Sequence, residues 1–338
     1  MTSPSLDLVE LGPDDHLFPA WCEVWAAGQR AERPDESPRP ASGHVALGHQ
    51  LVDPGGSRDG THRAAVVDGG VVGALRLILP TKDNTTVATV DVAVHPRHRR
   101  RGIGTVLLAE GVRLARAAGR TQLIAEVEEP GPDAAGRGFA LRHGWTCDLV
   151  ETRRDLVLPV DERRLADLEA EARAASADYE LVLWRDRTPD ELLDDRALLA
   201  RRMTTDAPQG DLPVEEEHWD GARIREYEAA HVARGRTVLS AGAVVGGRLV
   251  AYTDLQIPLA APERATQSGT LVLTEHRGHR LGARMKVAVL RELAATLPEV
   301  RRISTWNSDS NRPMVAVNEA LGFRPSGHVS YWSSRIPA

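Results

Sequence analysis

The stretch "HPRHRRRGIGTVLL", residues 95–108, places a run of arginine and histidine side chains directly before two glycines and an apolar pattern of helical spacing. A strand ending near Val94, a turn with Gly102 and Gly104, and a helix starting near Gly102 would leave backbone N–H groups without partners. The helix dipole adds partial positive charge there, and glycine lets phosphate oxygens approach the backbone. The stretch therefore predicts a site for a diphosphate.

The same pattern occurs a second time, which makes an accidental cluster of surface charge a weaker explanation. "LTEHRGHRLG" aligns with "HPRHRRRGIG", so that Arg277 lies 178 residues after Arg99, and "EALGF" follows "LRHGW" at the same interval. The chain is therefore expected to contain two copies of one domain, residues 1–158 and 178–338, with a linking helix within residues 159–177.

Each copy is expected to follow the order strand, helical region, hairpin, long strand, helix, strand, helix, strand. In the first copy, "AAVVDGGVVGALRLIL" places Asp68-Gly69-Gly70 between two alternating apolar runs, which predicts a hairpin. Residues 86–94 predict the next strand, and the following helix is expected to end at Gly119. The predicted fold class is α/β (α+β), with a mixed, mostly antiparallel sheet flanked by helices in each copy.

Three further segments have a distinct composition. Residues 31–62 are rich in Pro, Gly and Ser and are expected to be a long irregular stretch, either disordered or a lid over a binding site. Residues 161–176 have apolar side chains at helical spacing and predict the linking helix. "LPVEEEHW", residues 212–219, is interpreted as a solvated loop or, alternatively, as an acidic cradle for a cationic amine.

The composition limits the class of protein. A length of 338 residues predicts about two domains, and 42% hydrophobic with 27% charged residues is typical of a folded chain. The net charge of −6 argues against nucleic-acid binding and favours a cationic substrate. No bilayer-spanning run or signal pattern is found, so we expect a cytoplasmic protein that does not bind membranes. Cys22 and Cys147 lack metal-ligand spacing, so no metal site is expected.

The loop residues carry a family resemblance. Arg99-Arg100-Arg101-Gly102-Ile103-Gly104 resembles the acyl-coenzyme A pyrophosphate loop of the GCN5-related N-acetyltransferases (GNAT), and "FALRHGW" and "VNEALGF" resemble the family's last helix and following strand. The resemblance covers nearly the whole chain as a tandem pair of GNAT-like domains, similar to mycothiol synthase and its two-domain relatives. It implies that acetyl-coenzyme A, as a co-substrate, lies beside the strand that precedes each loop.

The resemblance also implies which residues contact the co-substrate. In the first copy these are Val92, Val94, Arg99, Arg100, Arg101, Gly102, Ile103, Gly104 and Thr105. In the second copy they are Thr270, Val272, Arg277, Gly278, Arg280, Gly282 and Asn311. A backbone N–H near Val94 or Val272 would polarise the thioester carbonyl. Because Arg280 replaces the first loop glycine of the second copy, we expect the first copy to be the main site.

The chain departs from the family's pattern at the position of its acid. The family often places a tyrosine four residues before the late glycine, where this chain has Ala140 and Asn318, and neither can protonate a thiolate. The amine must lose a proton, for which a nearby carboxylate would serve. The expected catalytic residues are Asp91, Glu126 and Glu128 in the first copy, and Asp254 with Tyr331 as the acid in the second. Asp133, the counterpart of Asn311, is expected to cap a helix.

These observations predict an N-acetyltransferase that moves an acetyl group from acetyl-coenzyme A to a primary amine of a small molecule, as a monomer or homodimer. Two alternatives stay open. The chain is either a degenerate acyl-coenzyme A sensor or scaffold, or a GNAT protein that uses another acyl group or a protein N-terminus.

Overall fold

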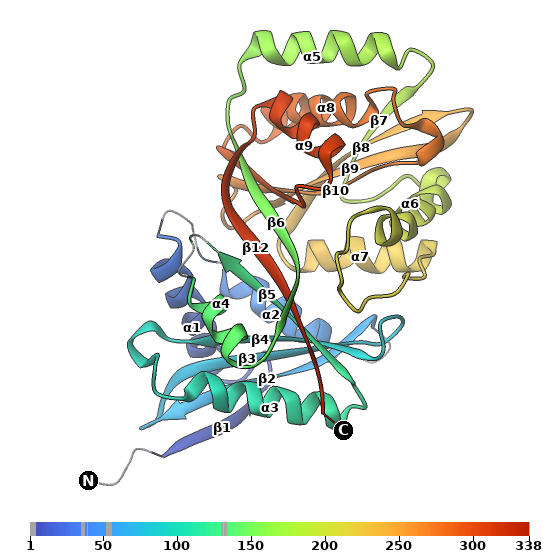
Figure 1. Ribbon diagram of the computed structural model, residues 1–338. Helices are drawn as coiled ribbons and strands as arrows, with labels where there is room; N and C mark the ends of the chain where they lie inside the picture. The colour runs from blue at the N-terminus through green and yellow to red at the C-terminus, as the bar shows by residue number, and fades with distance from the viewer. Residues whose placement is uncertain are drawn as a thin grey trace. The chain divides into compact units, whose positions relative to one another are not determined.

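The computed structural model describes residues 5–34, 38, 40–51, 56–129, 131 and 134–337 (Figure 1). The chain divides into two compact units that do not follow the order of the sequence. Unit 1 contains Met1–Leu149, Gly210–Glu215 and Ser330–Ala338, and unit 2 contains Val150–Gln209 and Glu216–Val329.

The sheet of unit 1 has the strand order β1-β2-β3-β4-β5-β12. Neighbours from β1 to β4 are antiparallel, whereas β4 and β5 run parallel. The predicted hairpin is confirmed, because Asp68 and Gly69 have φ angles of 50° and 78° in the two-residue turn. The strands are β1 (Leu6–Leu11), β2 (Arg58–Val67), β3 (Gly70–Pro80), β4 (Val87–Val94), β5 (Gln122–Glu129) and, from Ser330 onward, β12 (Arg324–Arg335).

Helices cover both faces of this sheet. On one face α1 (Phe18–Glu32) packs through Phe18 and Trp21 against Ala64 and Ala74, and α2 (Ala41–Leu51) lies beside it. On the other face α3 (Ile103–Ala117) packs against β3 and β4, and α4 (Ala135–Arg142) packs against β5. The end of α3 near Gly119 is confirmed, since this glycine has a φ of 73° just beyond the helix.

The expectation of an irregular stretch over residues 31–62 is wrong for much of its length. The helix α2 occupies Ala41–Leu51, and β2 begins at Arg58. His44, Leu47 and Leu51 of α2 are buried, so packing overrides the local signal of Pro, Gly and Ser. The predicted lid stays untested, because residues 35–37, 39 and 52–55 lie outside the described residues.

Unit 2 repeats this plan with the strand order β6-β11-β10-β9-β8-β7. Its sheet carries α6 and α7 on one face, and α5, α8 and α9 on the other, where α5 packs on α8 (Figure 1). The helix α5 lies within residues 159–177, where the linking helix is expected, and it belongs to unit 2. The strands are β6 (Thr146–Val157, from Val150 onward), β7 (Glu180–Arg185), β8 (Arg236–Val245), β9 (Arg248–Pro258), β10 (Arg264–Val272) and β11 (Arg302–Asn307); the helices are α5 (Glu162–Ala175), α6 (Leu193–Asp206), α7 (Gly221–Ala233), α8 (Leu281–Thr296) and α9 (Arg312–Leu321).

Each unit is completed by a strand from the other half of the sequence. Residues 150–157 of β6 belong to the first copy in sequence but pair with β11 of unit 2, with Thr152 opposite Asn307. The last residues of the second copy belong to unit 1, where Trp332 is 1% exposed and the Ile336 amide donates to the Thr121 carbonyl at 2.8 Å. The boundaries at residues 158 and 178 therefore describe the repeat in the sequence. As boundaries between folded domains they stay a prediction.

This exchange predicts that unit 1 loses stability when its last strand is weakened. Trp332→Ala is expected to lower the free energy of unfolding of unit 1 by about 3–5 kcal/mol, because it leaves a cavity in the core. Hydrogen exchange of the β5 amides and chemical denaturation would measure the loss. Leu259→Ala, at a side chain that is 58% exposed in unit 2, is the matched control. Equal protection of β5 in both variants would contradict the role of Trp332.

Candidate functional site

The two basic loops have the same backbone conformation. Each follows its strand with a short 3₁₀ turn, Pro96–His98 in unit 1 and Thr274–His276 in unit 2. Two left-handed residues come next, and the second of them is the N-cap of the helix. These residues are Arg100 (φ 65°) and Gly102 (φ 82°) in unit 1, and Gly278 (φ 89°) and Arg280 (φ 52°) in unit 2.

Glycine and arginine therefore exchange places between the loops. Each loop has glycine at one left-handed position and arginine at the other, and the arginine is the strained residue. The sequence alignment shows the exchange but not that both positions are left-handed. The replacement of the first glycine by Arg280 thus leaves the course of the second loop unchanged.

Both helices begin with backbone amides that point away from the helix. The first intrahelical hydrogen bonds run from Val106 N to the Gly102 carbonyl at 3.1 Å and from Arg284 N to the Arg280 carbonyl at 3.0 Å. The three amides before each of these donors have no acceptor within the helix. With the dipole of a helix of about four turns behind them, they can bind an anion with several acceptor oxygens.

The first arginine of each loop ties the loop to its strand. Arg99 Nε donates to the Val94 carbonyl at 3.1 Å, and Arg277 Nε donates to the Val272 carbonyl at the same distance. The guanidinium of Arg99 also pairs with Glu32 of α1 at 2.8 Å, and that of Arg277 pairs with Asp206 of α6 at 2.7 Å. Arg99 and Arg277 were predicted as cofactor contacts, and the structure places their side chains in this internal clamp.

The remaining predicted loop residues lie around the helix starts. Arg100 and Arg101 are exposed, Ile103 is buried, and Thr105 Oγ1 lies 3.2 Å from His143 Nε2 of α4's C-terminal end. A Cβ on Gly104 would lie 3.2 Å from Phe139. A Cβ on Gly282 would have none of the described atoms within 4 Å. In unit 2, Arg280 pairs with Glu171 at 2.7 Å, and Asn311 is the N-cap of α9. Asp133 lies outside the described residues.

The strand before each loop separates from its parallel neighbour. β4 and β5 pair over Val87–Thr89 and Gln122–Ile124 only, although both strands continue. β10 and β11 likewise pair only from Arg264 to Thr266 on β10. The predicted backbone contacts Val92, Val94, Thr270 and Val272 all lie beyond the last parallel pair. Their unpaired edges can accept or donate hydrogen bonds to an extended ligand.

The predicted acids of unit 1 share one face of the sheet. Val90 and Val92 pack on the α3 side, so Asp91 between them points to the α1 side, where it pairs with Arg76 at 2.6 Å. Glu126 and Glu128 of β5 alternate with core residues in the same way, and Glu128 pairs with Arg33 at 3.0 Å. The structure therefore brings the three carboxylates to the same side of the diverging strands.

Tyr331 lies in unit 1, together with Asp91, Glu126 and Glu128, and not in unit 2 with Asp254. It was expected to act with Asp254, but Tyr331 belongs to unit 1 and Asp254 to unit 2. Because Trp332 packs in the α3-side core, the neighbouring Tyr331 on β12 points to the face of Glu126 and Glu128. The strand exchange is the physical reason for this correction, and a repeat in the sequence gives no signal of it.

Asp254 lies in a buried polar cluster of unit 2. Its carboxylate accepts from Arg196 at 2.8 Å and from Ser240 Oγ at 2.8 Å, and the side chains of Asp254 and Arg196 are 5% and 7% exposed. Together with Tyr227 they line a cavity of about 20 Å³, which holds about one water molecule. Burial raises the pKa of the Tyr227 hydroxyl above its ordinary value. A cavity of this volume does not admit a substrate without rearrangement.

The acidic segment 212–219 is a loop, as expected. Glu215 exchanges hydrogen bonds with Asn84, Glu216 lies 3.8 Å from Arg201, and Glu217 accepts from Trp219 Nε1 at 3.0 Å. The alternative of a cradle for an amine stays a prediction. In the described part of the chain, no three ligand-type side chains are grouped to hold a metal, and no helix has the length and apolarity to cross a membrane.

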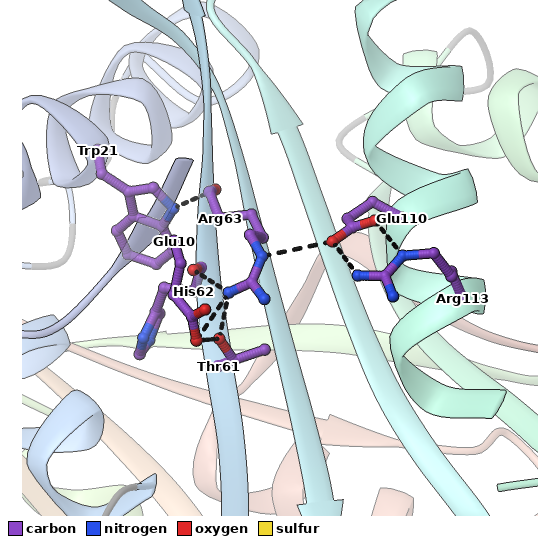
Figure 2. Close-up of polar contacts among 7 residues, drawn as sticks. All are labelled: Glu10, Trp21, Thr61, His62, Arg63, Glu110 and Arg113. Atoms are coloured by element: carbon purple, nitrogen blue, oxygen red, sulfur yellow. Dashed lines mark hydrogen bonds and ion pairs between the residues drawn. The ribbon is translucent and has the colours of Figure 1, made fainter. Parts of the chain in front are cut away.

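A network around Arg63, which the sequence did not indicate, holds α3 on the sheet (Figure 2). The Arg63 guanidinium pairs with Glu110 of α3 at 3.4 Å and with Glu10 of β1 at 3.1 Å, and the Arg63 carbonyl accepts from Trp21 Nε1 at 3.0 Å. The hydrogen bond from Arg113 is the main reason why the pKa of Glu110 is lowered. The network fixes the helix whose N-terminus forms the loop.

His62, next to Arg63, is a buried imidazole against the aromatic rings of Phe18 and Trp21. It lies opposite Arg76 on the neighbouring strand, and its Nε2 has no partner among the described residues. Burial, and secondly the charge of Arg76, lowers the pKa of His62 to about 4. The folded protein therefore contains the neutral imidazole.

The chain is similar to proteins of known structure. Residues 21–145 match the acetyltransferase (GNAT) family. A tandem GNAT protein from the clavulanic acid biosynthesis pathway is 33% identical over 99% of both chains, with a TM-score of 0.82. A GCN5-related N-acetyltransferase from Sphaerobacter thermophilus shares the fold over 98% of this chain and 96% of its own, with a TM-score of 0.63 and 16% identity. No curated protein matches the sequence.

The burial of His62 predicts a loss of stability in acid. Because the folded-state pKa is lowered from 6.5 to about 4, stability is complete above pH 6.5 and is lost as the pH falls through this window. The loss at pH 4 is expected to be about 3 kcal/mol, at roughly 1.4 kcal/mol per unit. Urea denaturation across this range would measure it. In His62→Gln the free energy of unfolding should change less with pH between pH 4 and 6.5. An unchanged pH dependence would contradict the role of His62.

The exchanged glycine and arginine predict opposite effects in the two loops. Arg280→Gly is expected to raise the free energy of unfolding by about 1 kcal/mol, because glycine adopts the left-handed conformation without strain. The exposed ion pair with Glu171 contributes little in comparison. Gly102→Arg, the matched change in unit 1, should lower the stability by a similar amount. Chemical denaturation measures the free energy of unfolding of both variants. A change in the same direction in both would contradict the strain argument.

Proposed function

The chain belongs to the GNAT acetyltransferase family as a tandem protein, and we propose on this basis that it transfers an acetyl group from acetyl-coenzyme A to a primary amine of a small molecule. Family membership supports acyl transfer in general. The acetyl donor and the amine acceptor are the proposed part. The tandem relative belongs to a small-molecule biosynthesis pathway, which favours a small acceptor over a protein N-terminus.

One observation carries the proposal: each unit has a helix start with outward amides directly after a strand that has left its parallel neighbour. The amides suit the diphosphate of coenzyme A, and the unpaired strand edge suits the amides of its pantetheine arm. A nucleotide bound in this way has its thioester at the diverging strands. A site that binds phosphate alone does not need the unpaired strand edge.

We propose unit 1 as the main catalytic unit, because it combines the glycines of the loop with groups for both proton transfers. The acceptor ammonium loses a proton to Asp91, Glu126 or Glu128, and the amine then attacks the thioester carbonyl. A backbone N–H near Val94 stabilises the developing oxyanion. The carbon–sulfur bond breaks, and Tyr331 gives its hydroxyl proton to the thiolate. The nitrogen of the new amide gives up its second proton, which restores the Tyr331 hydroxyl. The acceptor's proton, held by the carboxylate, returns to solvent.

A sensor function is the second candidate, and the ion pairs of the predicted bases favour it. Asp91 is held by Arg76, and Asp254 by Arg196, so neither carboxylate accepts a proton without losing a charged partner. Thiol release from acetyl-coenzyme A with a panel of small amines separates the two functions. Binding of coenzyme A without turnover on any amine would favour the sensor.

The proposal predicts that negative charge at a helix start abolishes binding in that unit. Gly104→Glu should remove the tight coenzyme A site of unit 1, because a carboxylate would stand where the diphosphate binds. Gly282→Glu is the matched change in unit 2, where a Cβ meets none of the described atoms within 4 Å. Calorimetric titration with coenzyme A gives the affinity and the number of sites.

Gly104→Ala is the control for the packing against Phe139, and it should bind coenzyme A at least 10-fold more tightly than Gly104→Glu, a difference of about 1.4 kcal/mol. Equal affinity and stoichiometry in the wild type and in the variant with both glutamates would contradict the proposed function.

A further inference from the structure

Unit 2 contains a buried chain of polar side chains that the mechanism above does not use. Lys286 of α8 donates from Nζ to Asn318 Oδ1 of α9 at 2.6 Å, and Asn318 Nδ2 donates to Asn307 Oδ1 of β11 at 2.7 Å. Lys286 is 2% exposed and Asn318 is 0% exposed. The amino group of Lys286 has a neutral acceptor here and no carboxylate among the described residues.

The fold does not require these polar groups. In unit 1 the residues 178 positions earlier are Leu108 of α3 and Ala140 of α4, which are each 7% exposed and belong to one apolar core cluster. The same helix pair therefore packs with apolar side chains. Burying an amino group with a single amide partner costs free energy that leucine would not cost. Unit 1 thus serves as an internal control and indicates a functional reason for Lys286.

The position of the chain connects it with the diverging strands. Asn307 is the last residue of β11, and the last parallel pair joins Thr266 to Ser304, three residues earlier. The polar chain therefore runs from inside unit 2 to the part of β11 that has left β10. This is where the proposed function places the thioester arm of the co-substrate.

We propose that Lys286 is the proton donor of unit 2, with Asn318 orienting its amino group toward the sulfur of the co-substrate. This inference rests on the proposed function. As the acceptor amine forms its bond to the carbonyl carbon, the carbon–sulfur bond breaks and the electron pair goes to sulfur. The Lys286 ammonium passes one proton to the thiolate, which gives a thiol and a neutral amine. The nitrogen of the new amide releases its extra proton to solvent, and Lys286 regains a proton from solvent.

The protonation of Lys286 suits this step. Burial lowers the pKa of Lys286 from 10.5 to about 7, so the ammonium and the amine are both populated near neutrality, as a proton donor requires. No charged group contributes to this shift. Four charged side chains on the elements packed against α8 have partners of their own, since Glu162 and Glu169 pair with Arg291 of α8, Asp254 pairs with Arg196, and Arg236 donates to Gln256. Arg284 of α8 donates to the Ser176 and Tyr179 carbonyls.

The experiment isolates unit 2 with Gly104→Glu and then compares three further changes in that background. Lys286→Met removes the charge at similar length. Lys286→Arg keeps the charge but does not release a proton near neutrality. The double change Lys286→Leu with Asn318→Ala installs the apolar pair of unit 1, so it is expected to fold as stably as the parent or more so.

Two measurements are made on each variant. The first is a titration of the thiol of bound coenzyme A, followed by the ultraviolet absorption of the thiolate. With Lys286, the pKa of the coenzyme A thiol should be about one unit or more lower than in Lys286→Met, because the ammonium stabilises the thiolate. In Lys286→Arg this thiol pKa should stay as low as with Lys286. The second is kinetics with the best amine. Both Lys286→Met and Lys286→Arg should lower kcat by about 10²-fold or more, with a far smaller change in KM for acetyl-coenzyme A.

The outcomes separate this inference from the proposed function. If coenzyme A binds unit 2 but its thiol pKa and kcat are the same in all variants, Lys286 is a structural residue and the inference is overturned. If Lys286→Arg retains full kcat, positive charge and not proton donation is what Lys286 supplies, which also overturns it. If unit 2 binds no coenzyme A in calorimetry, the proposed function fails for this unit and the role of Lys286 fails with it.

Discussion

The structure depends on a backbone bend that occurs once in each unit. Two left-handed residues turn the chain from the end of a strand into a helix, so that the first amides of the helix point away from the protein. The arginine clamp on the strand carbonyl and the Arg63 network on α3 hold this geometry in unit 1. The strand before the bend must also leave its parallel neighbour, because a fully paired strand would have no edge for a ligand.

The sequence was sufficient to predict the repeat, the hairpin at Asp68, a helix within residues 159–177 and the tandem family. Each of these depends on local periodicity or on two segments that can be aligned. The helix α2 was missed because Pro, Gly and Ser suggest irregular chain, whereas His44 and Leu47 are held by packing against the sheet. Local composition carries no information about such contacts.

The candidate site was harder to predict for the same reason. The sequence indicated the loop residues, but not that Arg99 and Arg277 turn back onto their strands. It assigned Tyr331 to the second copy, because a repeat in the sequence does not show that the last strand pairs in unit 1. It identified Asn318 as a departure from the family, but the buried partner Lys286 lies on a different helix. Long-range contacts decide each of these cases.

The exchange of terminal strands has a consequence for how the chain folds as it is synthesised. The edge of β5 has no β12 beside it until residues 330–335 have left the ribosome, although the rest of the first copy is already available. An uncovered strand edge invites pairing with other chains. Unit 1 therefore matures last although it is translated first. Pairings of such high sequence separation make folding slow, and a truncated chain would expose an aggregation-prone edge.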